Sequence, residues 1–183
     1  MKRETLDKLK EYALSNFDLK DVVPEIKIFT YPELQDATHI DELLDNKGRA
    51  IMLFLTEGDS KGHWIAILRH GNKIEMFDPY GHAPDTQDVK LGGSREDNER
   101  WGQNEDMFKK LVKKSGYGLV WNSKKHQPDK EGVNTCGRHS LLRILFHKYT
   151  LPEYNEILQK IKKETSIGTD DLATYLTAEM LEK

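Results

Sequence analysis

Hydrophobic positions recur at helical spacing near both ends of the chain. Residues 1–17 form one such stretch, with apolar side chains on one side and charged side chains elsewhere, which predicts an amphipathic helix. Residues 152–163 begin with a proline and predict a second helix. A third helix should start at Thr169 or Asp170 and run through residue 181, so helices are expected to flank whatever lies between them.

The middle of the chain carries the signals of a β-sheet. Residues 51–55 form a continuous apolar run, short enough for a buried strand. Two further runs, 63–68 and 73–77, flank a tight turn and predict a β-hairpin. Shorter segments complete the prediction, with strands at 26–29 and 118–121, helices at 38–45 and 107–112, and an exposed polar loop at 82–100. This order of elements predicts an α+β fold with a mainly antiparallel sheet flanked by helices.

Composition narrows the function classes. The 183 residues carry a net charge of −3, so no basic footprint indicates nucleic-acid binding. No apolar run approaches the roughly 18 residues of a membrane span, and no signal-peptide pattern opens the sequence. The single cysteine excludes an internal disulfide and favours a reducing, cytoplasmic compartment. We therefore expect one domain over residues 1–183, with neither a membrane nor a nucleic acid as partner.

That cysteine, Cys136, precedes a stretch that reads as a helix. Apolar residues recur at helical spacing over 141–145, so one face of this helix should be buried. Cys136 would then lie at or just before the helix N-terminus, where free N–H groups and the helix dipole favour thiolate over thiol. Gly137 has no Cβ, which would let a substrate carbonyl approach the sulfur. The alternative is a small, buried core cysteine.

The predicted hairpin supplies partners for the thiol, because His63 and Asp78 bracket it. If the two-residue turn is His70-Gly71, His63 lies directly opposite Asp78. If the turn is Gly71-Asn72, Asp78 faces Ile65 instead and lies one diagonal away from His63. Directly opposite Cβ atoms are about 4.5–5.5 Å apart and diagonal ones roughly 7–8 Å. Either register places an imidazole beside a carboxylate, although a surface His–Asp pair would look the same in sequence.

Cysteine, histidine and aspartate are the groups that thiol acyl transfer requires. The imidazole takes the thiol proton and later protonates the leaving amine, while the carboxylate orients the imidazole. The reaction also needs oxyanion donors, and Gln127, in the loop that leads to Cys136, offers a side-chain amide. His126 and His139 are alternative groups for proton transfer.

With these residues in hand, the chain resembles the clan of cysteine proteases that contains the Ulp/SENP-type SUMO peptidases and the adenovirus-type maturation proteases. The clan's order of His, acid, Gln and Cys-Gly is found here in Gly62-His63-Trp64, Phe77-Asp78-Pro79-Tyr80-Gly81, Gln127 and Asn134-Thr135-Cys136-Gly137. The resemblance covers roughly residues 30–150. It implies a papain-like core in permuted order, with the nucleophile at a helix N-terminus and helical extensions at either end.

The resemblance also implies roles: Cys136 as nucleophile, His63 as base, Asp78 as its orienter and Gln127 as oxyanion donor. Trp64 and Gly137 would border a narrow substrate cleft that prefers small residues before the scissile bond. The implied activity is a thiol endopeptidase without cofactor, which cleaves peptide or isopeptide bonds in viral precursors or in conjugates of ubiquitin or a ubiquitin-like modifier. The short chain is similar to compact viral members, which would act in the host cytoplasm or the virion. The loop from Gln127 to Cys136 is longer than in these relatives.

Three other readings remain open at this point. Effector-type protein acetyltransferases use the same order of triad residues and bind coenzyme A, usually with an inositol phosphate. The chain shows no basic cluster suited to such a polyphosphate. A non-catalytic binding module that retains a relic of the site is a second possibility. A zinc site built from His63, His82, Cys136 and His139 is a third, although these residues lack the spacing of metal ligands.

Overall fold

The computed structural model describes residues 2–58, 60–91 and 93–181. It divides the helix predicted for residues 1–17, of which residue 1 lies outside the described part, into α1 (Arg3–Glu11) and α2 (Asn16–Val22). Ser15 causes the break, because its side chain accepts a hydrogen bond from the N–H of Asp18 while the Asp18 carboxylate accepts one from the N–H of Ser15. This reciprocal capping starts a new helix and changes the direction of the chain.

Five strands form a single sheet in the order β1-β2-β3-β4-β5. The strands are β1 (Lys27–Thr30), β2 (Arg49–Glu57), β3 (Lys61–His70), β4 (Lys73–Phe77) and β5 (Gly118–Trp121). The pairs β2–β3 and β3–β4 are antiparallel, whereas β1–β2 and β4–β5 are parallel. The α+β fold is therefore confirmed, but the expectation of a mainly antiparallel sheet is wrong. The sheet is mixed because both edge strands are joined to their neighbours by long crossovers, which bring the chain back in the same direction.

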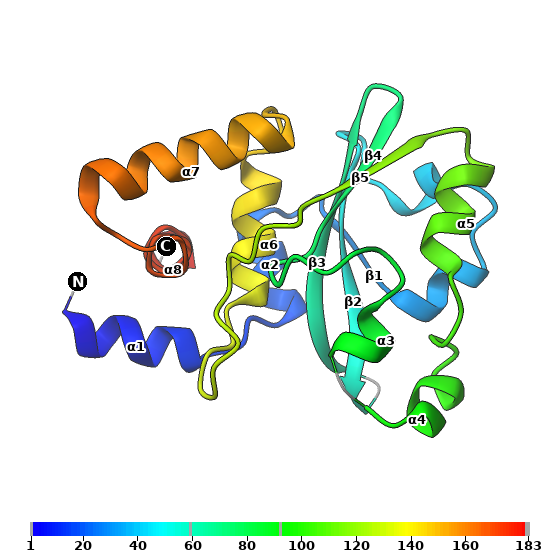
Figure 1. The fold of residues 1–183 in the computed structure, drawn as a ribbon, viewed down its shortest axis with the longest axis horizontal. Coiled ribbons are helices and arrows are strands. Elements are labelled where there is room, and N and C mark those ends of the chain that lie inside the picture. The colour runs from blue at the N-terminus through cyan, green and yellow to red at the C-terminus, as the bar shows by residue number, and fades with distance from the viewer. Residues whose placement is uncertain (1, 59, 92, 182–183) are drawn as a thin grey trace.

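Helices cover the two faces of the sheet (Figure 1). The remaining elements are the 3-10 helices Tyr31–Gln35 and Ile40–Leu43, and the α-helices α3 (Gln87–Lys90), α4 (Arg95–Arg100), α5 (Met107–Lys114), α6 (Cys136–Leu145), α7 (Leu151–Thr165) and α8 (Thr169–Leu181). Helix α6 lies against one face, with α1, α7 and α8 outside it, and α5 lies on the other side (Figure 1). The chain thus has a central sheet between two helical layers.

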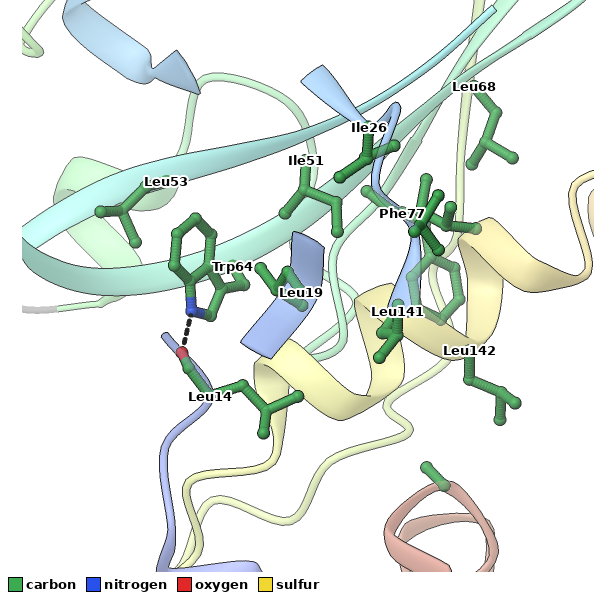
Figure 2. Close-up of a cluster of buried hydrophobic side chains, with 14 of the residues drawn as sticks. Leu14, Leu19, Ile26, Ile51, Leu53, Trp64, Leu68, Phe77, Leu141 and Leu142 are labelled. Carbon is green, nitrogen blue, oxygen red and sulfur yellow. Dashed lines mark hydrogen bonds between the residues drawn. The ribbon is translucent and has the colours of Figure 1, made fainter. Parts of the chain in front are cut away.

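Each face of the sheet carries its own buried core. On the α6 side, Ile51 and Leu53 of β2 pack with Trp64 and with Leu141 of α6 (Figure 2). On the α5 side, the alternate residues of β2 and β3 pack against α5 and the two 3-10 helices. Because β2 is covered on both faces, its sequence reads as a continuous apolar run rather than an alternating one. None of the described helices is both long and apolar enough to span a membrane.

Two segments differ from their predictions. The helix predicted from Thr38 is only a short 3-10 turn, Ile40–Leu43, capped by His39. Residues 82–100, predicted to form an exposed loop, contain α3 and α4 and bury both Gln87 and Asn98. These helices are four and six residues long, too short to produce a recognisable apolar period. The second difference matters for function, because Gln87 reaches the candidate site.

Candidate active site

Cys136 is the first residue of α6, as predicted, and its side chain is half-buried. Gly137 follows it against the core. A Cβ on Gly137 would lie 3.0 Å from Cβ of Leu14 and 3.1 Å from Cδ1 of Trp64. The position therefore accommodates glycine for a packing reason, since these two side chains occupy the space beside the helix start. This close approach brings α6 against the segment that follows α1 and against β3.

The thiol of Cys136 lies near three groups that favour its charged form. These are the imidazole of His63 and the backbone N–H groups of Trp64 and Gly137. Burial raises the pKa of the Cys136 thiol, but the hydrogen bond and the charge of His63 outweigh burial and hold that pKa below its ordinary value. The sulfur is therefore poised to ionise, as a nucleophilic cysteine must be.

His63 reaches Asp78 at the point where β4 ends. The hairpin turn is Gly71-Asn72, since His70 pairs with Lys73 and Ala66 pairs with Phe77, the last residue of β4. Asp78 therefore follows β4 in the second of the two registers considered above. Nε2 of His63 lies 2.7 Å from Oδ1 of Asp78, and both side chains are buried. The predicted His63–Asp78 contact is confirmed, and Nδ1 remains as the ring nitrogen that can face Cys136.

The carboxylate of Asp78 is held by more than His63. Its Oδ1 also accepts a hydrogen bond from the N–H of Tyr80 at 2.8 Å, and its Oδ2 accepts one from Nε2 of Gln87 at 3.0 Å. Asn122 holds the backbone of Asp78 on both sides, because its Oδ1 accepts from the Asp78 N–H at 2.9 Å and its Nδ2 donates to the Asp78 carbonyl at 2.8 Å. The orientation of Asp78 is thus set before any substrate arrives.

These contacts determine the charge of the pair. Burial raises the pKa of Asp78, but the charge and hydrogen bond of His63, together with the Gln87 amide, hold that pKa below its ordinary value. Burial alone would lower the pKa of His63. The negative charge and hydrogen bond of Asp78, assisted by Cys136, instead raise the pKa of His63 to about 10. The favoured state at neutral pH is therefore a carboxylate beside an imidazolium, with the Cys136 sulfur next to it.

Aromatic and polar groups surround the imidazole. The ring of Tyr80 stacks on the ring of His63 with centroids 4.8 Å apart, and the ring of His82 also stacks on Tyr80, at 5.5 Å. Nδ1 of His82 lies 3.6 Å from Oδ2 of Asp78. These stacked rings restrict the rotation of His63 and cover the His63–Asp78 contact.

Gln127 lies beside this stack and is buried. The backbone of the 126–127 segment donates to the Pro79 carbonyl, which places Gln127 next to Tyr80. Nε2 of Gln127 donates to the Tyr80 hydroxyl and to the Val133 carbonyl, both at 3.2 Å, while its Oε1 has no partner among the described residues. Both amide hydrogens are therefore engaged in this state, and a role as oxyanion donor would require one of them to be released.

The alternative residues lie elsewhere. His139 is fully buried and its Nε2 lies 3.0 Å from Oδ1 of Asp170 on α8. His126 is buried beside it, with ring centroids 6.1 Å apart, and burial lowers the pKa of His126 to about 4. Nδ2 of Asn134, two residues before Cys136, donates to the Glu11 carbonyl at 2.8 Å. Over the described part of the chain, no three His, Cys, Asp or Glu side chains gather in a way that could hold a metal ion.

A groove of about 760 Å³ lies beside the site. Its walls come from residues 13–16, from edge strand β1 and from the end of β2, and it includes Trp64 and Asn134. Trp64 belongs both to the buried core and to the wall of this groove. Its indole N–H donates to the Leu14 carbonyl at 2.8 Å, which fixes the side chain against another segment that lines the groove (Figure 2). Trp64 directly follows His63, and Asn134 precedes Cys136 by two positions, so the groove borders both candidate catalytic segments.

Sequence reasoning missed two residues that hold Asp78. Gln87 was hidden in a segment that lacks any periodic pattern. Asn122 follows the last strand, and its position depends on the parallel pairing of β5 with β4, in which Trp121 is opposite Met76. A parallel partner for β4 would have suggested Asn122 as a neighbour of Asp78, but no local signal indicates which strands pair.

Comparisons with known proteins add two likenesses. A protein of Sputnik virophage, described as "Uncharacterized protein V9", is 28% identical over 179 residues, which span 94% of this chain and 99% of that protein. Among solved structures, the crystal structure of ASFV pS273R protease aligns over 93% of this chain and 68% of its own chain, with a TM-score of 0.46 and 14% sequence identity. No family model matches the chain. The relative matched in sequence is a viral protein.

Proposed function

We propose that the protein is a cysteine protease in which Cys136 attacks a peptide or isopeptide carbonyl. The observation that carries this proposal is the position of His63, which lies next to Cys136 and 2.7 Å from the Asp78 carboxylate. A nucleophile, a base and an orienting carboxylate in contact are the constellation that acyl transfer requires. The placement of Cys136 on a helix packed against the strands that carry its partners supports a papain-like core in permuted order.

We propose the following sequence of steps. The Cys136 thiolate attacks the carbonyl carbon, and the imidazolium of His63 gives its proton to the leaving amine as the C–N bond breaks. A thioester to Cys136 remains. Water then attacks this thioester while His63 takes its proton, and the carboxylic acid is released with the thiol restored. The backbone N–H of Cys136, at the start of α6, and the Gln127 amide are the proposed donors to the oxyanion.

A protein chain is the substrate that the groove best accommodates. Its volume of about 760 Å³ and its position between β1 and Trp64 suit an extended segment that leads toward Cys136. Trp64 narrows the groove near the site, which supports a preference for small residues such as glycine before the scissile bond. Viral precursors and conjugates of ubiquitin-like modifiers both present such segments, and a viral relative favours neither of them by itself. The site needs a reduced thiol, so we propose that the enzyme acts in the cytoplasm or in a virion.

The decisive test measures the reactivity of Cys136, which is the only cysteine and can be followed by intact mass. Iodoacetamide should alkylate the native protein at pH 6 faster than it alkylates free cysteine, because the thiolate persists at that pH. His63→Ala should remove this excess and reduce hydrolysis at least about 10⁴-fold, because a base and its nucleophile act as a unit. Slow alkylation of the native protein, typical of an ordinary buried thiol, would contradict the proposal.

The substrate class needs a second probe. A ubiquitin-like protein that ends in an electrophile after Gly-Gly should label Cys136 if modifiers are the substrate, whereas short Gly-rich peptide electrophiles should label it in either case. Cys136→Ser, which keeps the size of the side chain, is the control for attachment at this residue. If the peptide probe reacts and the modifier probe does not, precursor processing is the substrate class that remains.

A further inference from the structure

The turn that carries Cys136 is held from two sides by helices far from it in the sequence. On one side lies α8, whose first turn contains Asp170. Oδ1 of Asp170 accepts a hydrogen bond from the hydroxyl of Thr135 at 2.6 Å and lies 3.0 Å from Nε2 of His139. Thr135 and His139 flank Cys136, and both are fully buried. A single carboxylate oxygen therefore ties together the two residues that bracket the candidate nucleophile.

On the other side lies the C-terminal end of α1, whose last carbonyl groups have no partners within their own helix. The Leu9 carbonyl accepts from Nε of Arg138 at 3.2 Å, and the Lys10 carbonyl accepts from the N–H of Asn134 at 2.8 Å. The Glu11 carbonyl accepts from the Asn134 side chain, as described above. The donors that cap α1 thus belong to the Cys136 turn.

Ion pairs join α1 to α8 and close this arrangement. Nζ of Lys10 contacts Asp171 and lies 3.6 Å from Oδ2 of Asp170, and Arg3 pairs with Asp171 at 2.5 Å. Lys10 is buried, so its ion pairs with α8 differ from exposed pairs such as Arg3–Asp171, which contribute little. Figure 1 shows the same arrangement, with α1 and α8 beside the lower part of α6. We call these contacts between α1, α8 and residues 134–139 the terminal clamp.

We propose that Asp170 is a positioning residue: through the terminal clamp, it sets the place of Cys136 relative to His63 and thereby the reactivity of the thiol. This inference rests on the proposed role of Cys136. Asp170 touches neither the sulfur nor the substrate groove, and it acts through Thr135 and His139. Asp170 can affect the thiol in this way because Cys136 must lie next to His63. A shift of the start of α6 would move the sulfur away from His63, which lowers the pKa of the thiol. Both chain termini would then be part of the catalytic unit rather than appendages to it.

Thr135 offers a matched pair of substitutions for the test. Thr135→Val keeps the shape of the side chain and removes the hydroxyl that donates to Asp170, whereas Thr135→Ser keeps the hydroxyl and removes a buried methyl group. The rate of alkylation of Cys136 by iodoacetamide is measured from pH 5 to 9, beside the melting temperature of each variant. Asp170→Asn removes the charge from the other partner. Lys8→Met is the control, because Lys8 lies on α1 but pairs only with Glu4 at an exposed position.

Thr135→Val and Asp170→Asn should each slow alkylation at pH 6 and move the midpoint of the alkylation–pH profile up by about one unit, which is about a tenfold change in the ionisation constant of the thiol. Thr135→Ser and Lys8→Met should stay within about twofold of the native rate. Alkylation of the double variant, Thr135→Val with Asp170→Asn, should be no slower than that of Asp170→Asn alone. Both substitutions act on the same hydrogen bond, so their effects should not add. Equal slowing by Thr135→Ser and Thr135→Val, in proportion to lost stability, would assign Thr135 and Asp170 a structural role only. If the native protein itself lacks fast alkylation at pH 6, the proposed function fails before the clamp is tested.

Discussion

A charged pair lies at each end of α6, where the helix packs against the β3–β4 hairpin. The pairs are Arg143–Glu75 and His63–Asp78, and their surroundings differ. At the C-terminal end, Arg143 holds Glu75 through two hydrogen bonds, Nε to Oε1 at 2.7 Å and Nη2 to Oε2 at 2.8 Å. The remaining donors of Arg143 reach the carbonyls of Phe146 and Tyr149, at 2.9 and 2.8 Å. At the N-terminal end, His63 lies next to Asp78 and Cys136, and Cys136 is only partly buried.

Unsatisfied polar groups gather at the N-terminal end. Seven buried side-chain polar atoms lack a hydrogen-bond partner within the described ranges. Five belong to residues around the Cys136 end of the helix: His82, His126, Gln127, His139 and Asp170. The other two are on α7, the Tyr154 hydroxyl and Oδ1 of Asn155. Buried polar groups are normally paired, so this concentration distinguishes the Cys136 end of α6 from the Arg143 end.

The comparison separates two uses of buried charge on one helix. Arg143–Glu75 is a closed pair in which each group is satisfied, so its removal should affect folding and not chemistry. His63–Asp78 is an open pair that ends at a sulfur and borders a groove, so its removal should affect chemistry more than folding. Substitutions in both pairs, and in Gln127 and Tyr80 beside the open pair, test this division.

The largest effect is expected from Asp78→Asn. His63 and the N–H of Tyr80 both contact Oδ1 of Asp78. An amide oxygen in that place would carry no charge for the imidazolium, and an NH₂ group there would favour the wrong tautomer and lose the hydrogen bond from Tyr80. We expect kcat/KM to fall by about 10³–10⁴-fold with a small change in stability. The loss should appear with any peptide substrate, and binding of the uncleaved substrate should be nearly unchanged.

The pH profile of the same variant gives a sharper check. In the native protein the imidazolium persists until pH approaches the His63 pKa of about 10, so the alkaline limb of kcat/KM should lie there. Without the Asp78 charge, burial dominates and lowers the His63 pKa, so that limb should move to below neutral pH in the variant. The stabilisation from the raised His63 pKa is present below the ordinary value near 6.5 and is lost as pH rises toward 10. Urea unfolding across this range should show that decline in the native protein and not in Asp78→Asn.

Arg143→Met should have the opposite signature. It leaves Glu75, which is 1% exposed, without its main partner, and we expect a loss of about 3–5 kcal/mol in the free energy of unfolding. The double variant with Glu75→Met should recover much of this loss, because no charge is then buried. Alkylation of Cys136 at pH 6 should keep its native rate in both variants, since Arg143 lies about 10 Å along the helix from Cys136. A slowed thiol in the folded Arg143→Met protein would show that the two ends are coupled.

The features that could be predicted from the sequence differ from those that could not in whether their signals are local. The β3–β4 hairpin and the start of α6 were predictable because their signals are local: an apolar run, a two-residue turn, and helical spacing after Cys136. The His63–Asp78 contact followed from the hairpin, whereas the placement of Cys136 beside this pair followed from the family resemblance. The mixed sheet was not predictable, because no local pattern states that β5 pairs parallel with β4.

The residues that support the site were hidden for a related reason. Asn122 holds Asp78, which lies 44 positions away in the sequence, and Asp170 holds Thr135, which lies 35 positions away. A single polar residue at such a distance leaves no period or motif in the sequence. Gln87 is nearer to Asp78 but sits in a four-residue helix that has no apolar pattern. The candidate catalytic residues could therefore be found from the sequence. The residues that hold them in place became visible only with the fold.

The smallest and most discriminating effect concerns Gln127. If its amide donates to the oxyanion, Gln127→Ala should lower kcat about 10²–10³-fold and leave KM nearly unchanged, because the bond exists only in the transition state. Gln127→Glu keeps the length of the side chain but cannot donate when ionised, so it should be at least as damaging. A change confined to KM would make Gln127 a binding residue instead.

Tyr80→Phe provides the matched variant for this prediction. It keeps the ring that stacks on His63 and removes the hydroxyl that accepts a hydrogen bond from Gln127 at 3.2 Å. An oxyanion donor that must leave this hydroxyl to act would be released by the change, so kcat should be unchanged or rise by up to about threefold. A residue whose only task is to tie the Pro79 turn to Val133 would instead lose a support, and Tyr80→Phe would lower kcat in the same direction as Gln127→Ala. Steady-state kinetics of the two single variants and their combination therefore decide whether Gln127 belongs to the open, chemical end of the comparison or to its structural surroundings.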